Sequence, residues 1–125
     1  MTFKSGLPTK PPPYWPRVRK RLHWAIQLAG YDRPRMRYYF RAYLKEGDDQ
    51  LMGFALTRTG SGSIWIATGL CAIKWAFVDT MLHEIAHVLA GQIESPEHPH
   101  EHSDLWGLIH ARLYRAYVDD PEGPK

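Results

Sequence analysis

The sequence predicts an α+β fold in which one helix precedes, and two helices follow, a three-stranded antiparallel sheet. Apolar residues recur at the helical period in residues 17–30, 75–90 and 103–118. Between residues 35 and 68, stretches rich in aromatic and β-branched residues are separated by clusters of glycine, serine and aspartate, which is typical of short strands and turns. A chain of 125 residues can bury about two thirds of its unfolded surface in one core. We therefore expect a single domain.

The domain is expected to span residues 17–118, between a flexible leader (residues 1–16) and a short tail (119–125). The leader is rich in proline, which predicts an extended or disordered segment outside the core. The first helix is then predicted from Arg17 to Gly30, since glycine ends helices readily. Its apolar face comprises Val18, Leu22, Ala25, Ile26 and Ala29.

Three strands are predicted between the first two helices. Charged and aromatic residues alternate over residues 35–44, and the turn at 46–49 leads into a second strand at 51–57, as in a hairpin. A second turn, at 59–63, leads into a third strand at 63–68.

The second helix carries the sequence HEIAH at residues 83–87. On a helix His83 and His87 lie on one face about one turn apart, roughly 6 Å, which suits two ligands of one metal ion. Glu84 projects about 100° further round, where its carboxylate could accept a proton from water beside the metal without binding it. Gly91 and Pro96 predict the end of this helix.

A third metal ligand must come from elsewhere, because catalytic zinc usually takes three protein ligands and leaves the fourth position to water. The metzincin pattern is excluded, since it needs glycine at position 90 and histidine at 93, where this chain has Ala90 and Ile93. We favour His102, which lies just before a predicted helix and would be held by it. The alternatives that stay open are His100, His98, Glu94, Glu101 and Asp104.

His83, Glu84 and His87, followed by the segment from His102 to Trp106, resemble the SprT-like zinc metallopeptidases, which have a minimal zincin fold. In that family HExxH is followed, after a loop, by a histidine, a small residue, two variable residues and an aromatic residue. The similarity covers about the last half of the chain, and Ser103 stands where the family usually has glycine. The resemblance implies a Zn²⁺-dependent peptidase with His83, His87 and His102 as metal ligands and Glu84 as the catalytic base.

The net charge of +3 is unevenly distributed along the chain. Residues 1–45 contain 11 lysines and arginines and one aspartate, whereas residues 46–125 contain 5 lysines and arginines and 12 acidic residues. Aromatic residues lie among the N-terminal arginines, as in nucleic-acid-binding surfaces. The alternative interpretation is a solvated helix face together with the outward face of a strand. Two other functions thus stay open: a nucleic-acid-binding module with a structural zinc, and a protease recruited by DNA to DNA-bound proteins. Zinc-dependent hydrolysis of a non-peptide amide also stays open.

Three further features are candidates for supporting roles. Asp79, one turn before His83, could orient that imidazole or interact with the helix dipole. His110 and Tyr114 could stabilise an oxyanion or only pack. The strand at 63–68 could hold an extended peptide or protein substrate.

The remaining features limit the class of protein. Cys71 is the single cysteine, so no disulfide forms within the chain, and it is expected to be a small core residue. No stretch approaches the roughly 20 apolar residues of a membrane helix, and the N-terminus lacks the apolar run of a signal peptide. We expect a cytoplasmic protein without a membrane partner; the sequence gives no oligomeric state.

Overall fold

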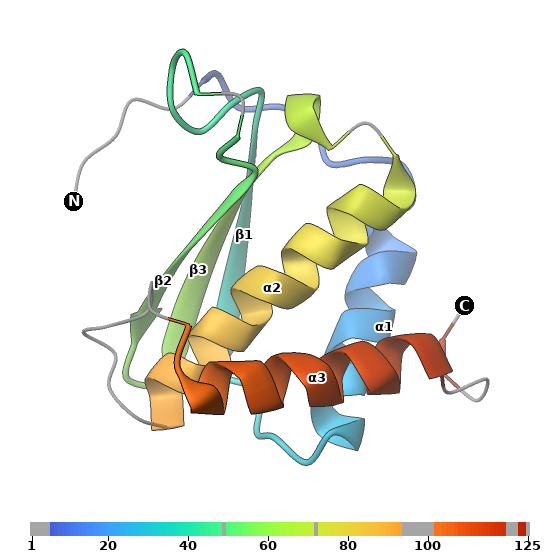
Figure 1. Cartoon of the computed structure of the whole chain (residues 1–125). Helices are drawn as coiled ribbons and strands as arrows, with labels where there is room; N and C mark the ends of the chain where they lie inside the picture. The colour runs from blue at the N-terminus through green and yellow to red at the C-terminus, as the bar shows by residue number, and fades with distance from the viewer. Residues whose placement is uncertain (1–5, 49, 72, 94–101, 120–122, 125) are drawn as a thin grey trace.

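The computed structural model describes residues 6–48, 50–71, 73–93, 102–119 and 123–124, and it confirms the α+β class. The elements in chain order are α1 (Trp15–Leu28), β1 (Arg35–Arg41), β2 (Gly53–Arg58), β3 (Ser61–Ala67), the 3-10 turn η1 (Thr68–Leu70), α2 (Lys74–Ile93) and α3 (Asp104–Asp119). Figure 1 shows that the three helices lie on one face of the sheet, with α2 between the sheet and α3. None of the described helices lies on the other face of the sheet.

The sheet is mixed, which corrects the prediction of a purely antiparallel sheet. Its strand order is β1-β3-β2: β3 is parallel to β1 and antiparallel to β2. The tight turn between β2 and β3, where Gly60 has a φ of +75°, makes these two strands neighbours. Because β3 lies between β1 and β2, these two strands do not form the hairpin that the turn at 46–49 suggested. Residues 42–52, which connect β1 to β2, are long enough to pass β3.

Helix α2 packs closely on the sheet, and at several contacts a Cβ added to a glycine would overlap the facing side chain. A Cβ on Gly62 of β3 would lie 2.4 Å from Val88 Cγ1, and one on Gly91 would lie 2.7 Å from Thr57 Cγ2. The prediction that Gly91 ends the helix is wrong, because α2 continues to Ile93. Gly91 instead allows the helix to approach β2.

The beginning of the described chain rests on the sheet. Gly6 donates its N–H to the Tyr43 carbonyl and Thr9 donates to the Phe40 carbonyl, while Pro8 forms an isolated antiparallel bridge with Arg41. Helix α1 begins at Trp15, two residues before the predicted start, and Trp15 is buried. Part of the segment expected outside the core therefore contributes to it, because the Trp15 ring packs on Tyr38 and Phe40.

Among the described residues, none of the helices is long and apolar enough to span a membrane.

Candidate metal centre

Helix α2 presents His83, Glu84 and His87 from a nearly fixed position. The helix is buried over most of its length between the sheet and α3, so it has little freedom to move as a unit. His87 and Glu84 are buried and His83 is half-buried. The two imidazole rings lie on one face of the helix, with centroids 5.0 Å apart, as the spacing of the motif predicted.

His102, just before α3, completes a group of three imidazoles. Its Nε2 atom lies 3.2 Å from Nε2 of His83 and 3.1 Å from Nε2 of His87. One potential ligand atom from each residue falls within 4.8 Å of the others. The structure thus brings His102 to the two motif histidines, as we favoured from the sequence.

This arrangement fits a metal ion better than it fits hydrogen bonding alone. A neutral imidazole nitrogen offers either one N–H or one lone pair, so Nε2 of His102 cannot make two good hydrogen bonds at once. A cation shared by three lone pairs satisfies all three nitrogens. Two nitrogens bound to tetrahedral zinc at about 2.0–2.1 Å lie about 3.3–3.4 Å apart, which is close to the two Nε2 distances from His102. The three-histidine cluster could therefore hold a metal ion.

Trp106 holds the cluster from the side of α3. Its indole stacks on His102 with a centroid distance of 4.0 Å and an interplanar angle of 9°. Its Nε1–H donates to the His83 carbonyl at 3.3 Å, and its backbone N–H donates to Ser103 Oγ, which caps α3 as predicted. Trp106 thus connects His102 to α2, a role that the sequence analysis did not assign to it.

Glu84 lies beside the cluster in an apolar environment. Its side chain is 7% exposed, and burial raises its pKa to about 8. A bound cation would oppose this effect, because an opposite charge nearby favours the carboxylate. Gly53 of β2 provides the space for this side chain, since a Cβ there would lie 2.9 Å from both Cγ and Oε2 of Glu84. Gly53 was not recognised from the sequence, which carries no signal for an approach between distant segments.

His83 is held towards its neutral, metal-binding form. Burial is the main cause of its lowered pKa, and the charges of His102 and His110 act in the same direction. The opposing charge of Asp79 has the smallest influence on the pKa, and the Asp79 side chain is exposed on α2. The orienting role considered for Asp79 gains no support from these contacts.

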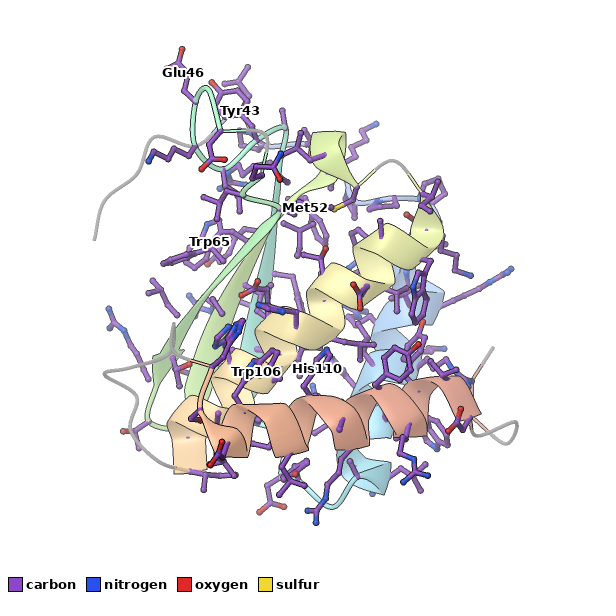
Figure 2. The ribbon with its side chains drawn as sticks, in the orientation of Figure 1. Tyr43, Glu46, Met52, Trp65, Trp106 and His110 are labelled. Atoms are coloured by element: carbon purple, nitrogen blue, oxygen red, sulfur yellow. The ribbon has the colours of Figure 1, made fainter. Side chains whose placement is uncertain are left out.

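An aromatic row leads from the cluster along α3. His110 stacks on the other side of Trp106, with a centroid distance of 4.9 Å, and its ring lies 6.3 Å from that of His83. Figure 2 shows Trp106 and His110 between α2 and α3. Tyr114 follows one turn later, where its ring meets Trp75 edge-on. His110 thus lies within reach of the cluster, whereas Tyr114 lies farther along the row and is exposed.

Several of the residues left open as third ligands cannot be compared with His102. His98, His100, Glu94 and Glu101 lie outside the described residues. Asp104 is described, in the first turn of α3, and it does not belong to the cluster.

No protein-family model, curated protein or solved structure matches this chain.

Proposed function

We propose that this protein is a zinc-dependent peptidase of the SprT-like, minimal zincin type. The observation that carries the proposal is the convergence of three imidazole nitrogens beside one buried carboxylate. Three neutral nitrogen ligands are the donor set of many catalytic zinc sites, and three protein ligands leave one tetrahedral position for water or substrate. His83, His87 and His102 would hold the metal.

Zinc bound there would supply a Lewis acid that polarises a carbonyl and lowers the pKa of water towards about 7. Glu84 is the base in this proposal: its carboxylate receives the proton of the attacking water and returns it to the leaving amine. The buried position of the Glu84 carboxylate, next to His83 of the three-histidine cluster, supports this role. His110, whose ring lies 6.3 Å from that of His83, is the side chain that we propose as a hydrogen-bond donor to the developing oxyanion.

The expectation that strand 63–68 holds the substrate is wrong in its choice of strand. Residues 63–67 of this segment belong to β3, both edges of which are paired within the sheet, and Thr68 begins η1. Among the described strands, β2 has one neighbour, and its residue Gly53 contacts Glu84. We therefore propose that an extended peptide lies along the edge of β2 that no described strand pairs with, where main-chain hydrogen bonds would position the scissile bond with little dependence on side chains.

The test combines metal analysis with two pairs of matched variants. Purified protein is expected to contain one zinc, which His102→Ala loses and His110→Ala retains. Glu84→Gln is expected to keep its zinc while its cleavage of a denatured protein falls by about 10³-fold or more, within the range for loss of general base catalysis. Asp119→Asn removes an exposed carboxylate at the end of α3 and should leave cleavage unchanged. Cleavage by Glu84→Gln at the wild-type rate would refute the mechanism.

A further inference from the structure

The sheet face away from the helices carries a basic and aromatic surface. The register places three rows across it: Arg35, Ser61 and Arg58; then Arg37, Ser63 and Leu56; then Tyr39, Trp65 and Phe54. Figure 2 shows Trp65 on this side of the sheet, opposite the helices. Phe54 is buried beside Trp65, and we call the other eight residues the outer face.

A groove of about 400 Å³ runs across this face. Its lining includes the three arginines Arg35, Arg37 and Arg58, the serines of β3 and the indole of Trp65. All three arginines are exposed, and none of the described residues that line the groove is acidic. Three cations thus lie at one end of the groove and an aromatic ring at the other.

The surface continues around the edge of the sheet. A second groove of about 390 Å³ lies where β1 faces α1, and Arg37 lines both grooves. Arg19 of α1 lies in the second groove, and Tyr39 stacks on Trp65 with centroids 4.9 Å apart. Arg41 lies over the Tyr39 ring, 5.7 Å from its centroid. The positive charge is therefore continuous from the outer face around the edge of β1 to Arg19 of α1.

Only some of the N-terminal arginines are available for this surface. Arg21 donates to the carbonyls of Tyr117 and Pro124, so it joins α1 to the end of the chain. Arg33 lies 3.2 Å from Nδ1 of His23. Arg58, which lies outside the basic N-terminal half, joins Arg35 and Arg37 instead. The basic region predicted from the sequence is thus divided by the fold between structural contacts and the outer face.

We propose that the outer face binds single-stranded nucleic acid. Arginine pairs with phosphate through two parallel N–H donors, and aromatic rings stack on unpaired bases of any sequence. A paired base is covered by its neighbours in a duplex, so the aromatic end of the groove selects a single strand. An acidic peptide would use the arginines but gain little from Trp65. Since this surface lies opposite the metal centre, the inference goes beyond the proposed peptidase activity and does not depend on it.

The experiment measures the binding of the purified 125-residue chain to a labelled oligothymidylate of about 12 nucleotides. The test variant is Arg35→Gln/Arg37→Gln/Arg58→Gln. The control, Arg17→Gln/Lys20→Gln/Arg115→Gln, removes the same charge from exposed positions on α1 and α3. Each phosphate contact contributes about 0.7 to the slope of log affinity against log salt, so the test variant should lose about 2 from this slope and the control almost nothing.

A second variant separates stacking from charge. Trp65→Leu keeps an apolar side chain on the sheet and should weaken oligothymidylate binding about tenfold, at the low end of base–aromatic stacking. Binding by Glu84→Gln protein should equal that of wild type, which distinguishes this proposal from the peptidase mechanism. Zinc content and circular dichroism establish that each variant is folded.

Four results would overturn the proposal: absence of single-strand binding by wild type, equal losses in the two triple variants, a duplex bound as tightly as the single strand, or displacement by polyglutamate with no effect of Trp65→Leu. The last result would identify an acidic protein segment as the partner. Tighter binding of oligouridylate than of oligodeoxyuridylate, or the reverse, would support the proposal and identify the preferred sugar, because these two strands differ only in the 2′-OH.

Discussion

Replacing Gly53 by alanine should disturb Glu84 without disturbing the metal ligands. The backbone of Gly53 is in a conformation open to alanine, because its φ is not positive. The new Cβ would lie 2.9 Å from Cγ and Oε2 of Glu84 and 2.7 Å from Cγ2 of Thr80. Ordinary carbon contacts are about 3.5–4.0 Å, so the Glu84 side chain must move by about 0.6–1.1 Å.

A displacement of this size should lower the rate of catalysis. A misplacement of about 1 Å can lower a rate about 10²-fold. We therefore expect kcat/KM for the cleavage of a denatured protein substrate carrying a quenched fluorophore to fall by about 10-fold to 10²-fold, which corresponds to an activation free energy higher by about 1.4–2.7 kcal/mol. The affinity for zinc should stay within a few-fold of wild type, because none of the three closest atoms belongs to a histidine.

Two controls make this prediction specific. Gly107→Ala adds a Cβ on α3 with no neighbour within 4 Å, and it should leave cleavage unchanged while stability rises by about 0.5–1 kcal/mol. Thr80→Ser removes the other close atom, so the double variant Gly53→Ala/Thr80→Ser should stay impaired through Glu84. Full recovery in the double variant, or unchanged cleavage in Gly53→Ala alone, would refute the reasoning.

Four further predictions concern the metal, the packing and the pH dependence. Trp106→Leu removes the ring stacked on His102 and should weaken zinc binding about tenfold in a chelator competition; unchanged affinity would exclude a positioning role. Removing zinc with a chelator should lower the free energy of unfolding by about 2.7 kcal/mol relative to protein at a free zinc concentration 100 times its Kd. The same urea midpoint with and without zinc would argue against a zinc site in the folded protein. Gly62→Ala should lower the free energy of unfolding by about 1–3 kcal/mol, because its Cβ would overlap Val88. The double variant Gly62→Ala/Val88→Ala should lose less stability than the sum of the losses in the two single variants. Burial lowers the pKa of His23 to about 4, whereas the same histidine in the unfolded chain has an ordinary pKa near 6.5. As the pH falls, the unfolded chain therefore binds the proton before the folded chain does. The free energy of unfolding should be unaffected by this group above pH 6.5 and should fall by about 1 kcal/mol as the pH approaches 4, after allowance for the partial exposure of His23. His23→Gln should remove this part of the pH dependence, and an identical slope in wild type and variant would contradict it.

The sequence determined the local features of this protein. Helical periodicity identified three helices close to their observed bounds, because one apolar stripe in each must face a core. The spacing of His83 and His87 required that both lie on one helix face. His102 was favoured for a local reason as well, since it directly precedes a helix whose cap is Ser103.

Tertiary structure decided everything that depends on contacts between distant segments. Whether β3 pairs with β1 in parallel is set by where the chain returns to the sheet, and alternating apolar residues are the same in either case. The same limit concealed the glycine contacts of α2, the space that Gly53 leaves for Glu84, and the gathering of Arg58 with Arg35 and Arg37. Hydrophobic periodicity specifies which side of an element is buried, but it does not specify which other element covers it.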